Sequence, residues 1–255
     1  MAEKDQNLPE FAKIRLFTGE DLAPGALLAL PEAQSHYLQH VMRRSTGDTL
    51  RLFNGRDGEW GAAIEESSRK GVRVRVGECA RAQDAVRDIT LLFAPIKKAP
   101  MGWLVEKATE LGVARLQPVL TTRTQGGHVS LERLRAHAVE ASEQSWRLSV
   151  PEISSAMGLM AALAALPAET HVLYCDERRV APPALQALHA ARAHKDRPWA
   201  ILIGPEGGFS PEEQRDLAAW PNMVPVSLGP RIVRAETAAL MALTLWQSVL
   251  GDLEG

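Results

Sequence analysis

Short apolar runs that alternate with helical segments occupy the chain after residue 88. Ile89–Ala94, His171–Cys175 and Trp199–Ile203 are brief and mostly apolar, a pattern typical of strands that are buried on both faces. Further strands are expected at 116–120 and 224–228, and helices at 101–111, 131–145 and 235–250. Because strands and helices alternate, we predict an α/β domain whose mostly parallel sheet is covered on both faces.

The preceding part of the chain has a β-rich pattern. Thr49–Phe53 alternates polar and apolar residues, Asn54–Gly58 supplies turn residues, and Trp60–Ile64 can return as the next strand. Val72–Val76 alternates strictly, so its valines are expected to face inward and its arginines outward. This meander, with a short helix expected at His36–Arg43, fits a small β-barrel better than an open sheet.

The two patterns predict two domains. With 255 residues the chain can form one large domain or two modest ones. Residues 78–88 are polar, so we place the β-barrel domain at 1–82 and the α/β domain at 83–255. The helix expected at 235–250 is apolar nearly all round, which indicates either a dimer interface or full burial within one subunit.

Composition excludes several classes of protein. The 45% hydrophobic and 24% charged residues are ordinary for a globular chain, and no apolar stretch reaches the roughly eighteen residues of a membrane span. The polar N-terminus lacks the apolar core of a signal peptide, so we expect a cytoplasmic protein with no membrane partner. Cys79 and Cys175 are the only cysteines, which makes neither a disulfide framework nor a zinc site, and no metal is expected.

A glycine-containing turn follows the strand expected at 199–203. Gly204–Gly208 leads into a strong helix start, in which Ser210 suits the N-cap, Pro211 the first turn and Glu213 the capping box. Such a turn lies at the carboxyl edge of the sheet, where open α/β folds bind ligands. A tight turn without a ligand is the alternative. The spacing excludes both a Walker-type phosphate loop and the usual dinucleotide fingerprint.

A second segment, Leu228–Ala238, also runs from a strand through a Gly-Pro turn into a helix. Glu236 is favourable in a first helical turn because of the helix dipole, whereas Arg231 and Arg234 are mildly unfavourable there. These arginines indicate an anionic or polar ligand. The alternative for Arg234 is a salt bridge to Glu236 or to another acid.

The net charge of −2 weighs against a simple electrostatic binder of nucleic acid. Locally, residues 43–75 contain eight cations and five acids, an excess of three positive charges. A basic surface on the first domain and a solvated strand face both account for this excess.

The two glycine-containing segments, Gly204–Ser210 and Leu228–Ala238, together resemble the RsmE family of ribosomal RNA methyltransferases. Lys107–Val113, Glu143–Ser145 and His36–Arg43 agree with the same family, so the resemblance spans nearly the whole chain. It implies a SPOUT-type α/β domain with a C-terminal trefoil knot, preceded by a PUA-like β-barrel that helps to hold RNA. It also implies a homodimer that uses S-adenosylmethionine to methylate N3 of one uridine, of the uracil 1498 type, in 16S ribosomal RNA, within the assembled small subunit.

The resemblance and the chemistry assign the site residues. Uracil N3 carries a proton, so methylation needs a base to accept it or a cation to stabilise the anionic ring. The candidate catalytic residues are Arg234, Glu206 and Glu236. The candidate cofactor-binding residues are Ile203, Gly204, Pro205, Glu206, Gly207, Gly208, Leu228, Gly229, Ile232, Val233, Arg234 and Ala238. The candidate RNA-binding residues are Arg43, Arg44, Arg51, Arg73, Arg75, Arg123 and Arg147; ordinary solvated surface arginines are the alternative for each.

Two segments depart from the family pattern. The family usually has Gly-Arg after Glu-Gln-Ser, where this chain has Trp146-Arg147. A tryptophan lacks the backbone freedom of a glycine, so this loop is expected to differ. Lys97–Gly102 is also looser than the usual Lys-Gly pattern. Two other functions remain open: a methyltransferase that acts on a different RNA, such as transfer RNA, and a PUA-type RNA-binding protein whose catalytic half is inactive.

Overall fold

The computed structural model describes residues 14–96, 98–125, 129–178 and 180–254. By its internal contacts the chain divides into two units. The first unit runs to Ala85 and also takes in Ser142–Val150, which lies far beyond the boundary predicted at residue 82; the second comprises Val86–Ala141 and the residues from Pro151 onward. The polar N-terminus, on which the expected localisation rests, and Lys97 of the Lys97–Gly102 segment lie outside the described residues.

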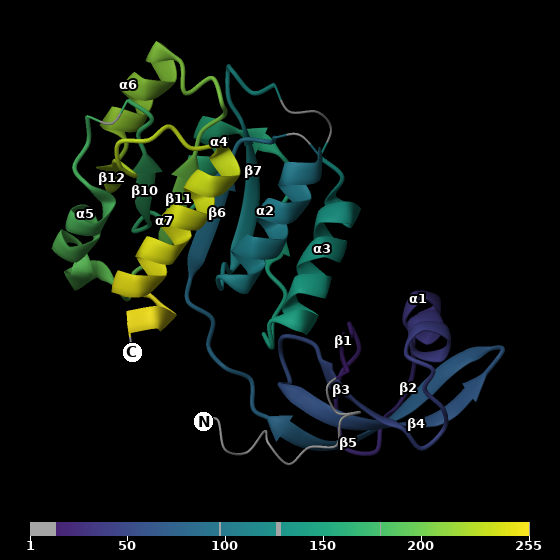
Figure 1. Ribbon diagram of the computed structural model, residues 1–255. Coiled ribbons are helices and arrows are strands. Elements are labelled where there is room, and N and C mark those ends of the chain that lie inside the picture. Colours follow the sequence, from purple (N-terminus) through teal and green to yellow (C-terminus); the bar gives the residue numbers. More distant parts are fainter. Residues whose placement is uncertain (1–13, 97, 126–128, 179, 255) are drawn as a thin grey trace. The chain divides into compact units, whose positions relative to one another are not determined.

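The first unit is built on a five-stranded sheet with the order β1-β3-β4-β5-β2 (Figure 1). Its strands are β1 (Arg15–Phe17), β2 (Leu27–Ala29), β3 (Thr49–Phe53), β4 (Glu59–Ser68) and β5 (Gly71–Arg81). β1 pairs with β3 in parallel, and the other neighbours are antiparallel. The short helix expected at His36–Arg43 begins earlier than predicted: α1 covers Glu32–His36 and continues into the π-helical turn η2 (Tyr37–Val41).

The core of this unit follows the predicted alternation in β5. Val72, Val74 and Val76 are buried, while Arg73 and Arg75 between them are exposed. The loop at Trp146 also differs from the expectation in an informative way. Trp146 itself adopts a left-handed backbone conformation with φ of +63°. The tryptophan therefore keeps a conformation that ordinarily favours glycine.

The second unit contains a seven-stranded sheet in its described part, and every pair in it is parallel. Its strands are β6 (Ile89–Phe93), β7 (Arg115–Leu120), β8 (Glu152–Ile153), β9 (Met157–Gly158), β10 (His171–Cys175), β11 (Trp199–Ile203) and β12 (Met223–Val226). The strand order is β12-β10-β11-β6-β7-β8, with β9 paired to β7. The predicted parallel sheet is thus confirmed.

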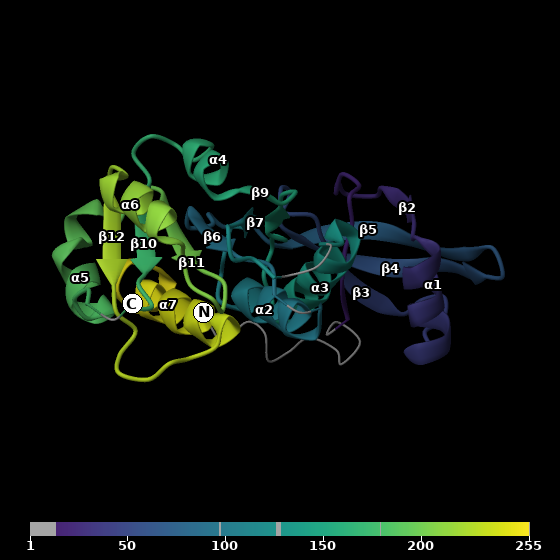
Figure 2. The ribbon, with the colours of Figure 1, turned by 90° about the horizontal axis from the view of Figure 1, so that it is seen from above.

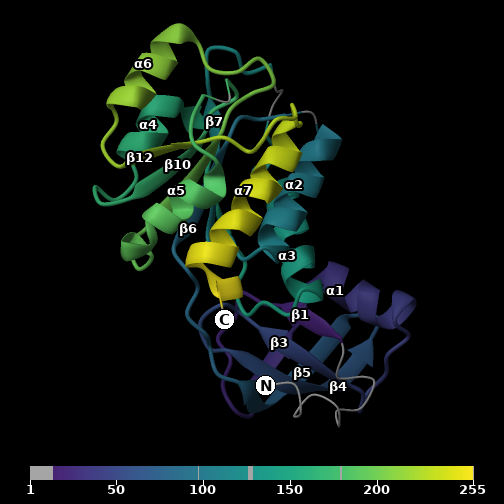
Figure 3. The ribbon, with the colours of Figure 1, turned by 60° about the vertical axis from the view of Figure 1, so that its left-hand side comes forward.

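Helices cover both faces of this sheet. They are α2 (Lys98–Glu110), α3 (Leu131–Gln144), α4 (Leu159–Ala164), α5 (Ala184–Ala190), α6 (Pro211–Ala219) and α7 (Ala235–Leu250), with short 3-10 turns η3 (Arg192–His194) and η4 (Asp252–Glu254). α4 and α6 pack on one face, and α2, α5 and α7 lie on the other (Figure 2). α7 runs between α2 and α5 (Figure 3).

Burial within the chain accounts for much of the apolar character of α7. Its side chains Ala239, Leu243, Trp246 and Leu250 are buried against the rest of the unit. The second of the two expected explanations, burial inside one subunit, therefore applies to this face of the helix.

Candidate functional site

A pocket of about 530 Å³ lies at the carboxyl edge of the parallel sheet. Its walls come from the segments that follow β6, β10, β11 and β12, the edge where open α/β sheets bind ligands. The lining residues are Ile96, Pro100, Cys175, Asp176, Glu177, Ile203, Gly204, Pro205, Glu206, Leu228, Gly229, Arg231, Ile232, Val233, Arg234, Ala235, Glu236 and Ala238. The structure therefore brings the two glycine-containing segments together in one pocket.

Most of the residues predicted to bind the cofactor line this pocket, and only Gly207 and Gly208 do not. These two glycines shape the turn instead. Gly208 has φ of +66°, and a Cβ there would lie 2.5 Å from Oε1 of Glu177. The backbone amide of Gly208 donates to the carbonyl of Pro205 at 2.9 Å. Gly208 is therefore required by the tight turn itself, which was the alternative to a ligand-binding role for this segment.

Gly204 is required by close packing. A Cβ at Gly204 would lie 2.6 Å from the ring of Phe209, which is fully buried beneath the turn. The Phe209 ring packs edge-on against Tyr174 of β10, with centroids 5.5 Å apart. The backbone at Gly204 is thus held directly against the hydrophobic core while its other side faces the pocket.

The N-termini of α6 and α7 are capped differently. In α6 the predicted capping box is confirmed: Ser210 Oγ accepts from the Glu213 amide at 3.2 Å, and Glu213 Oε2 accepts from the Ser210 amide at 2.7 Å. α7 begins after Arg234, whose side chain makes no capping hydrogen bond. Ala235 and Glu236, in the first turn of α7, line the pocket. The positive end of the α7 dipole is therefore presented to a ligand there.

The charged side chains around the pocket carry both signs. Among the described residues, Arg231 and Arg234 are exposed and have no ion-pair partner, so the salt bridge considered between Arg234 and Glu236 is not formed. Glu236 is half-buried and Glu206 is exposed. The two arginines and the two glutamates therefore line the same pocket, and no ion pair forms between them.

Sequence reasoning missed the contribution of the segment after β10. Asp176 is buried, and Arg178 binds it with two hydrogen bonds, Nε to Oδ1 at 2.9 Å and Nη2 to Oδ2 at 3.1 Å. This pairing raises the pKa of Arg178. Glu177 accepts a hydrogen bond from the Phe209 amide at 3.3 Å and so joins the glycine turn. Adjacent acids directly after a buried strand were the signal that could have identified this wall.

Cys175, at the end of β10, also lines the pocket. Burial raises the pKa of its thiol to about 12. The thiol is therefore protonated at neutral pH, which excludes a thiolate nucleophile at this position. Among the described residues no cluster of His, Cys, Asp and Glu has the arrangement of a metal site, and no described helix is long and apolar enough to cross a membrane.

Arg123, predicted to contact RNA, lies against the glycine turn. Its Nη1 donates to the carbonyl of Gly207 at 2.8 Å. The neighbouring amide of Thr122 donates to Oε1 of Glu213 at 2.7 Å. Although burial disfavours the charged carboxylate, hydrogen bonds from the Ser210 and Thr122 amides lower the pKa of Glu213 overall. The loop after β7 is thus bonded to both the turn and the start of α6.

The predicted RNA-binding arginines of the first unit have different environments. Arg43 is exposed and has φ of +52°, and Arg44 is half-buried. Arg75 forms an ion pair with Glu65 of the neighbouring strand, with Nε and Oε2 2.5 Å apart, and Arg73 lies 3.9 Å from Glu66. Arg73 and Arg75 therefore lie on a solvated face of β5, which was the alternative to a basic RNA-binding surface.

For Arg51 the prediction of an RNA contact is wrong. Its side chain is buried, and its Nη1 pairs with Oε2 of Glu59 at 2.8 Å. Glu59 also pairs with Arg15, whose Nε lies 2.5 Å from Oε1. The physical reason is that Ser142–Val150 covers this face of β3, so a side chain that would otherwise point to solvent is enclosed. Arg147 belongs to the same segment, is half-buried, and donates to Ser149 Oγ at 3.3 Å.

Two family models match the chain. The model described as an RNA methyltransferase domain matches residues 83–247, and one described as an RNA methyltransferase PUA domain matches residues 30–77. The PUA match covers strands of the five-stranded sheet. The match to the RNA methyltransferase domain covers the whole parallel sheet.

Relatives and solved structures agree with these matches. Ribosomal RNA small subunit methyltransferase E of Rickettsia conorii is 33% identical over 90% of this chain and 93% of its own length. The protein of the same name from Synechocystis is 32% identical over 92% of this chain and 78% of its own. A structure of this methyltransferase from Neisseria gonorrhoeae bound to S-adenosyl methionine is 26% identical, with a TM-score of 0.80 over 94% of this chain and 98% of that one.

A further structure, of a methyltransferase from Legionella pneumophila with bound SAM, is 29% identical, with a TM-score of 0.76 over 92% of this chain and 97% of that one. Sequence and fold therefore match along nearly the whole length of both partners. With its PUA-type unit, its parallel sheet and the pocket at the edge of that sheet, the chain belongs to the family of ribosomal RNA small subunit methyltransferase E.

Proposed function

We propose that this protein is an S-adenosylmethionine-dependent methyltransferase that methylates N3 of one uridine, of the uracil 1498 type, in 16S ribosomal RNA. The observation that carries the proposal is the single pocket formed by Ile203–Glu206 and Leu228–Ala238 at the carboxyl edge of the sheet. Family members named for the small ribosomal subunit, and neighbours solved with S-adenosylmethionine, support both the cofactor and the RNA.

The residues of the pocket fit this cofactor. A volume of about 530 Å³ is in the range of sites for small molecules and cofactors. Ile203, Leu228 and Ala238 offer an apolar wall for the adenine, whereas Glu177 and Glu206 offer carboxylates for the ammonium and sulfonium charges. The uncapped N-terminus of α7 suits the carboxylate of the methionine tail.

The pocket also supplies groups for the chemistry at uracil. When bound, S-adenosylmethionine supplies a methyl group on a positively charged sulfur. Glu206 and Glu236 are the candidates to accept the N3 proton: both line the pocket, and neither carboxylate is held by an ion pair among the described residues. Arg234 is the group that stabilises negative charge on the uracil ring, since it faces the pocket without an acidic partner.

The family resemblance extends the proposal to the assembly. It includes a trefoil knot in the C-terminal part of the second unit, a homodimer, and action on RNA within the assembled small subunit. Ile232 supports a covered site, because this apolar side chain lines the pocket while 89% of its surface is exposed in the single chain. A bound cofactor, a second subunit or RNA would bury it.

Two measurements test the proposal. Titration calorimetry with S-adenosylmethionine is expected to show one site per chain, and no measurable binding would contradict an enzymatic function. Small subunits from a strain that lacks the gene, incubated with protein and cofactor, are expected to gain 3-methyluridine in nucleoside mass spectrometry. A different methylated nucleoside, or methylation of transfer RNA alone, would reject the proposed target.

A variant pair links these results to the pocket. Ala238 lines the pocket and Thr244 lies exposed further along the same helix. Ala238→Trp is expected to abolish cofactor binding because the ring fills the cavity, whereas Thr244→Trp is expected to bind normally. Equal binding by both variants would place the cofactor elsewhere.

A further inference from the structure

An exposed tryptophan covers two buried arginines in the first unit. The exposed fraction of the whole residue is 38% for Trp146 but only 4% for Arg15 and 3% for Arg51. Their guanidinium carbons lie 5.3 Å and 4.9 Å from the centre of the Trp146 ring. Two cations therefore lie over the ring, while more than a third of the residue's surface remains accessible to solvent.

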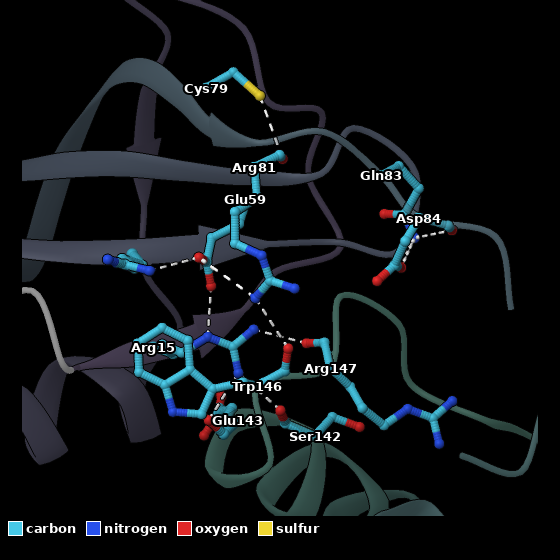
Figure 4. A network of polar contacts seen from close by, with 11 residues as sticks. Arg15, Glu59, Cys79, Arg81, Gln83, Asp84, Ser142, Glu143, Trp146 and Arg147 are labelled. Carbon is cyan, nitrogen blue, oxygen red and sulfur yellow. Dashed lines mark hydrogen bonds and ion pairs between the residues drawn. The ribbon is translucent and has the colours of Figure 1, made fainter. Parts of the chain in front are cut away.

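The backbone around Trp146 is held by hydrogen bonds from two arginines (Figure 4). Arg15 donates through Nη1 to the carbonyl of Ser142 at 2.9 Å and through Nη2 to the carbonyl of Arg147 at 2.7 Å, so it holds the backbone on both sides of Trp146. Arg81 donates to the carbonyl of Trp146 itself at 3.1 Å. The backbone that carries the ring is thus held in place before any ligand arrives, which lowers the entropy lost on binding.

The charges around the ring are predominantly positive. Three guanidinium groups, from Arg15, Arg51 and Arg81, surround the buried carboxylate of Glu59. A second carboxylate, that of Glu143, accepts from the amide of Phe17 at 2.9 Å. Of the three guanidinium-bearing side chains, that of Arg81 is the most exposed, at 31%. A partly exposed aromatic ring beside positive charge suits a planar base that is attached to a phosphate.

We propose that Trp146 is a stacking site for an unpaired base of the RNA substrate. The base would stack on the exposed part of the ring, and Arg81 would lie within reach of its phosphate backbone. This inference rests on the proposed function for the identity of the substrate as RNA, and it adds a contact from a segment that sequence reasoning assigned only through Arg147. Stacking is tolerant of sequence, so the site serves to position the strand rather than to read it.

A purely structural role would be to shield the arginine cluster from water. That role requires an apolar cover, but it gives no reason for a residue in a left-handed conformation, unfavourable for any side chain, to keep an exposed aromatic ring. The two roles are separable by experiment, because a cover affects folding stability and a stacking site affects affinity for single-stranded RNA.

The test is the fluorescence anisotropy of a fluorescein-labelled single-stranded RNA, titrated with the full-length protein without cofactor. Trp146→Gly keeps a residue suited to φ of +63° and removes the ring. It is expected to weaken binding roughly tenfold, and Trp146→Phe is expected to restore most of the affinity. Trp103→Ala removes a ring of similar exposure, 43%, from the second unit and is expected to bind as the wild type does.

Unchanged affinity in a folded Trp146→Gly protein would overturn the proposal, and so would an equal loss in Trp103→Ala. If Trp146→Gly does not fold, wild-type protein decides the question: photocrosslinking of a single strand containing 5-iodouridine is expected to label Trp146, and labelling only at other residues would overturn it. Because these measurements omit the cofactor, failure of the methyltransferase assay would refute the proposed function without deciding this one.

Discussion

The guanidinium group of Arg123 donates a hydrogen bond to the carbonyl of Gly207 at 2.8 Å, which joins the loop after β7 to the turn after β11. The aliphatic part of Arg123 also lies beside Gly207, because a Cβ there would be 3.5 Å from the Arg123 Cβ. The turn that forms one wall of the pocket is therefore held by a residue that does not line the pocket itself.

Arg123→Ala is expected to weaken cofactor binding about fivefold, because one hydrogen bond that holds the turn contributes on the order of 1 kcal/mol. Titration calorimetry with S-adenosylmethionine measures this change. Arg123→Lys, which keeps the charge and one donor, is expected to recover part of the affinity. If Arg123 serves only as an RNA contact, both variants will bind the cofactor normally and will lose affinity for RNA alone.

Gly208→Ala is expected to destabilise the second unit, because the left-handed conformation alone costs a side chain about 1–2 kcal/mol. The new Cβ would also lie 2.5 Å from Oε1 of Glu177 and displace that carboxylate. Gly207→Ala is the matched control from the same turn, since its Cβ meets only ordinary contacts. Urea unfolding followed by circular dichroism compares the two, and similar midpoints would contradict the role assigned to Gly208.

The fold could be predicted where local patterns are long or strongly apolar. Strands β6, β10 and β11 and helix α7 lie where the sequence places them, because their burial on one or both faces imposes a clear pattern. The short elements were not predicted because they are too short to show such a pattern. α4 contains 6 residues, and β8 and β9 contain 2 each, too few for any periodicity to appear.

The site could be predicted only in part. Gly204 and Gly229 mark turns whose chemistry is local, so the two segments that contain them were found from sequence. Asp176 joins them only because β10 is the neighbour of β11 in the sheet, which is a relationship in space. Arg51 was misassigned for a similar reason: the alternation in β3 cannot show that a segment about ninety residues later covers its outer face.

Glu59→Gln is expected to destabilise the first unit by about 3–5 kcal/mol, because it removes the buried carboxylate that pairs with the guanidinium groups of Arg15 and Arg51. Burial already lowers the pKa of Arg15, so the cost of enclosing this charge is present in the native protein. Chemical denaturation monitors the change. Glu65→Gln, which breaks the exposed pair with Arg75, is the control and should leave the unfolding midpoint nearly unchanged.

Cys175 is expected to resist alkylation at pH 8, whereas the exposed Cys79 should react. A pKa of about 12 leaves the Cys175 thiolate fraction on the order of a thousandfold below that of an ordinary thiol at this pH. Because the pKa is raised, reactivity should increase only as the pH approaches 12. Peptide mass spectrometry after timed iodoacetamide treatment measures both sites, and equal rates would contradict the assigned environment.

Arg234→Ala is expected to lose about a hundred- to a thousandfold in turnover and far less in cofactor affinity, because its charge acts on the anionic uracil of the transition state. Arg234 is exposed at the pocket, so its removal leaves no buried partner uncompensated and the fold should be preserved. Arg234→Lys retains the charge and should keep intermediate activity. Single-turnover methylation of small subunits, with calorimetry on the same variants, separates the effects, and full turnover in Arg234→Ala would remove this residue from the mechanism.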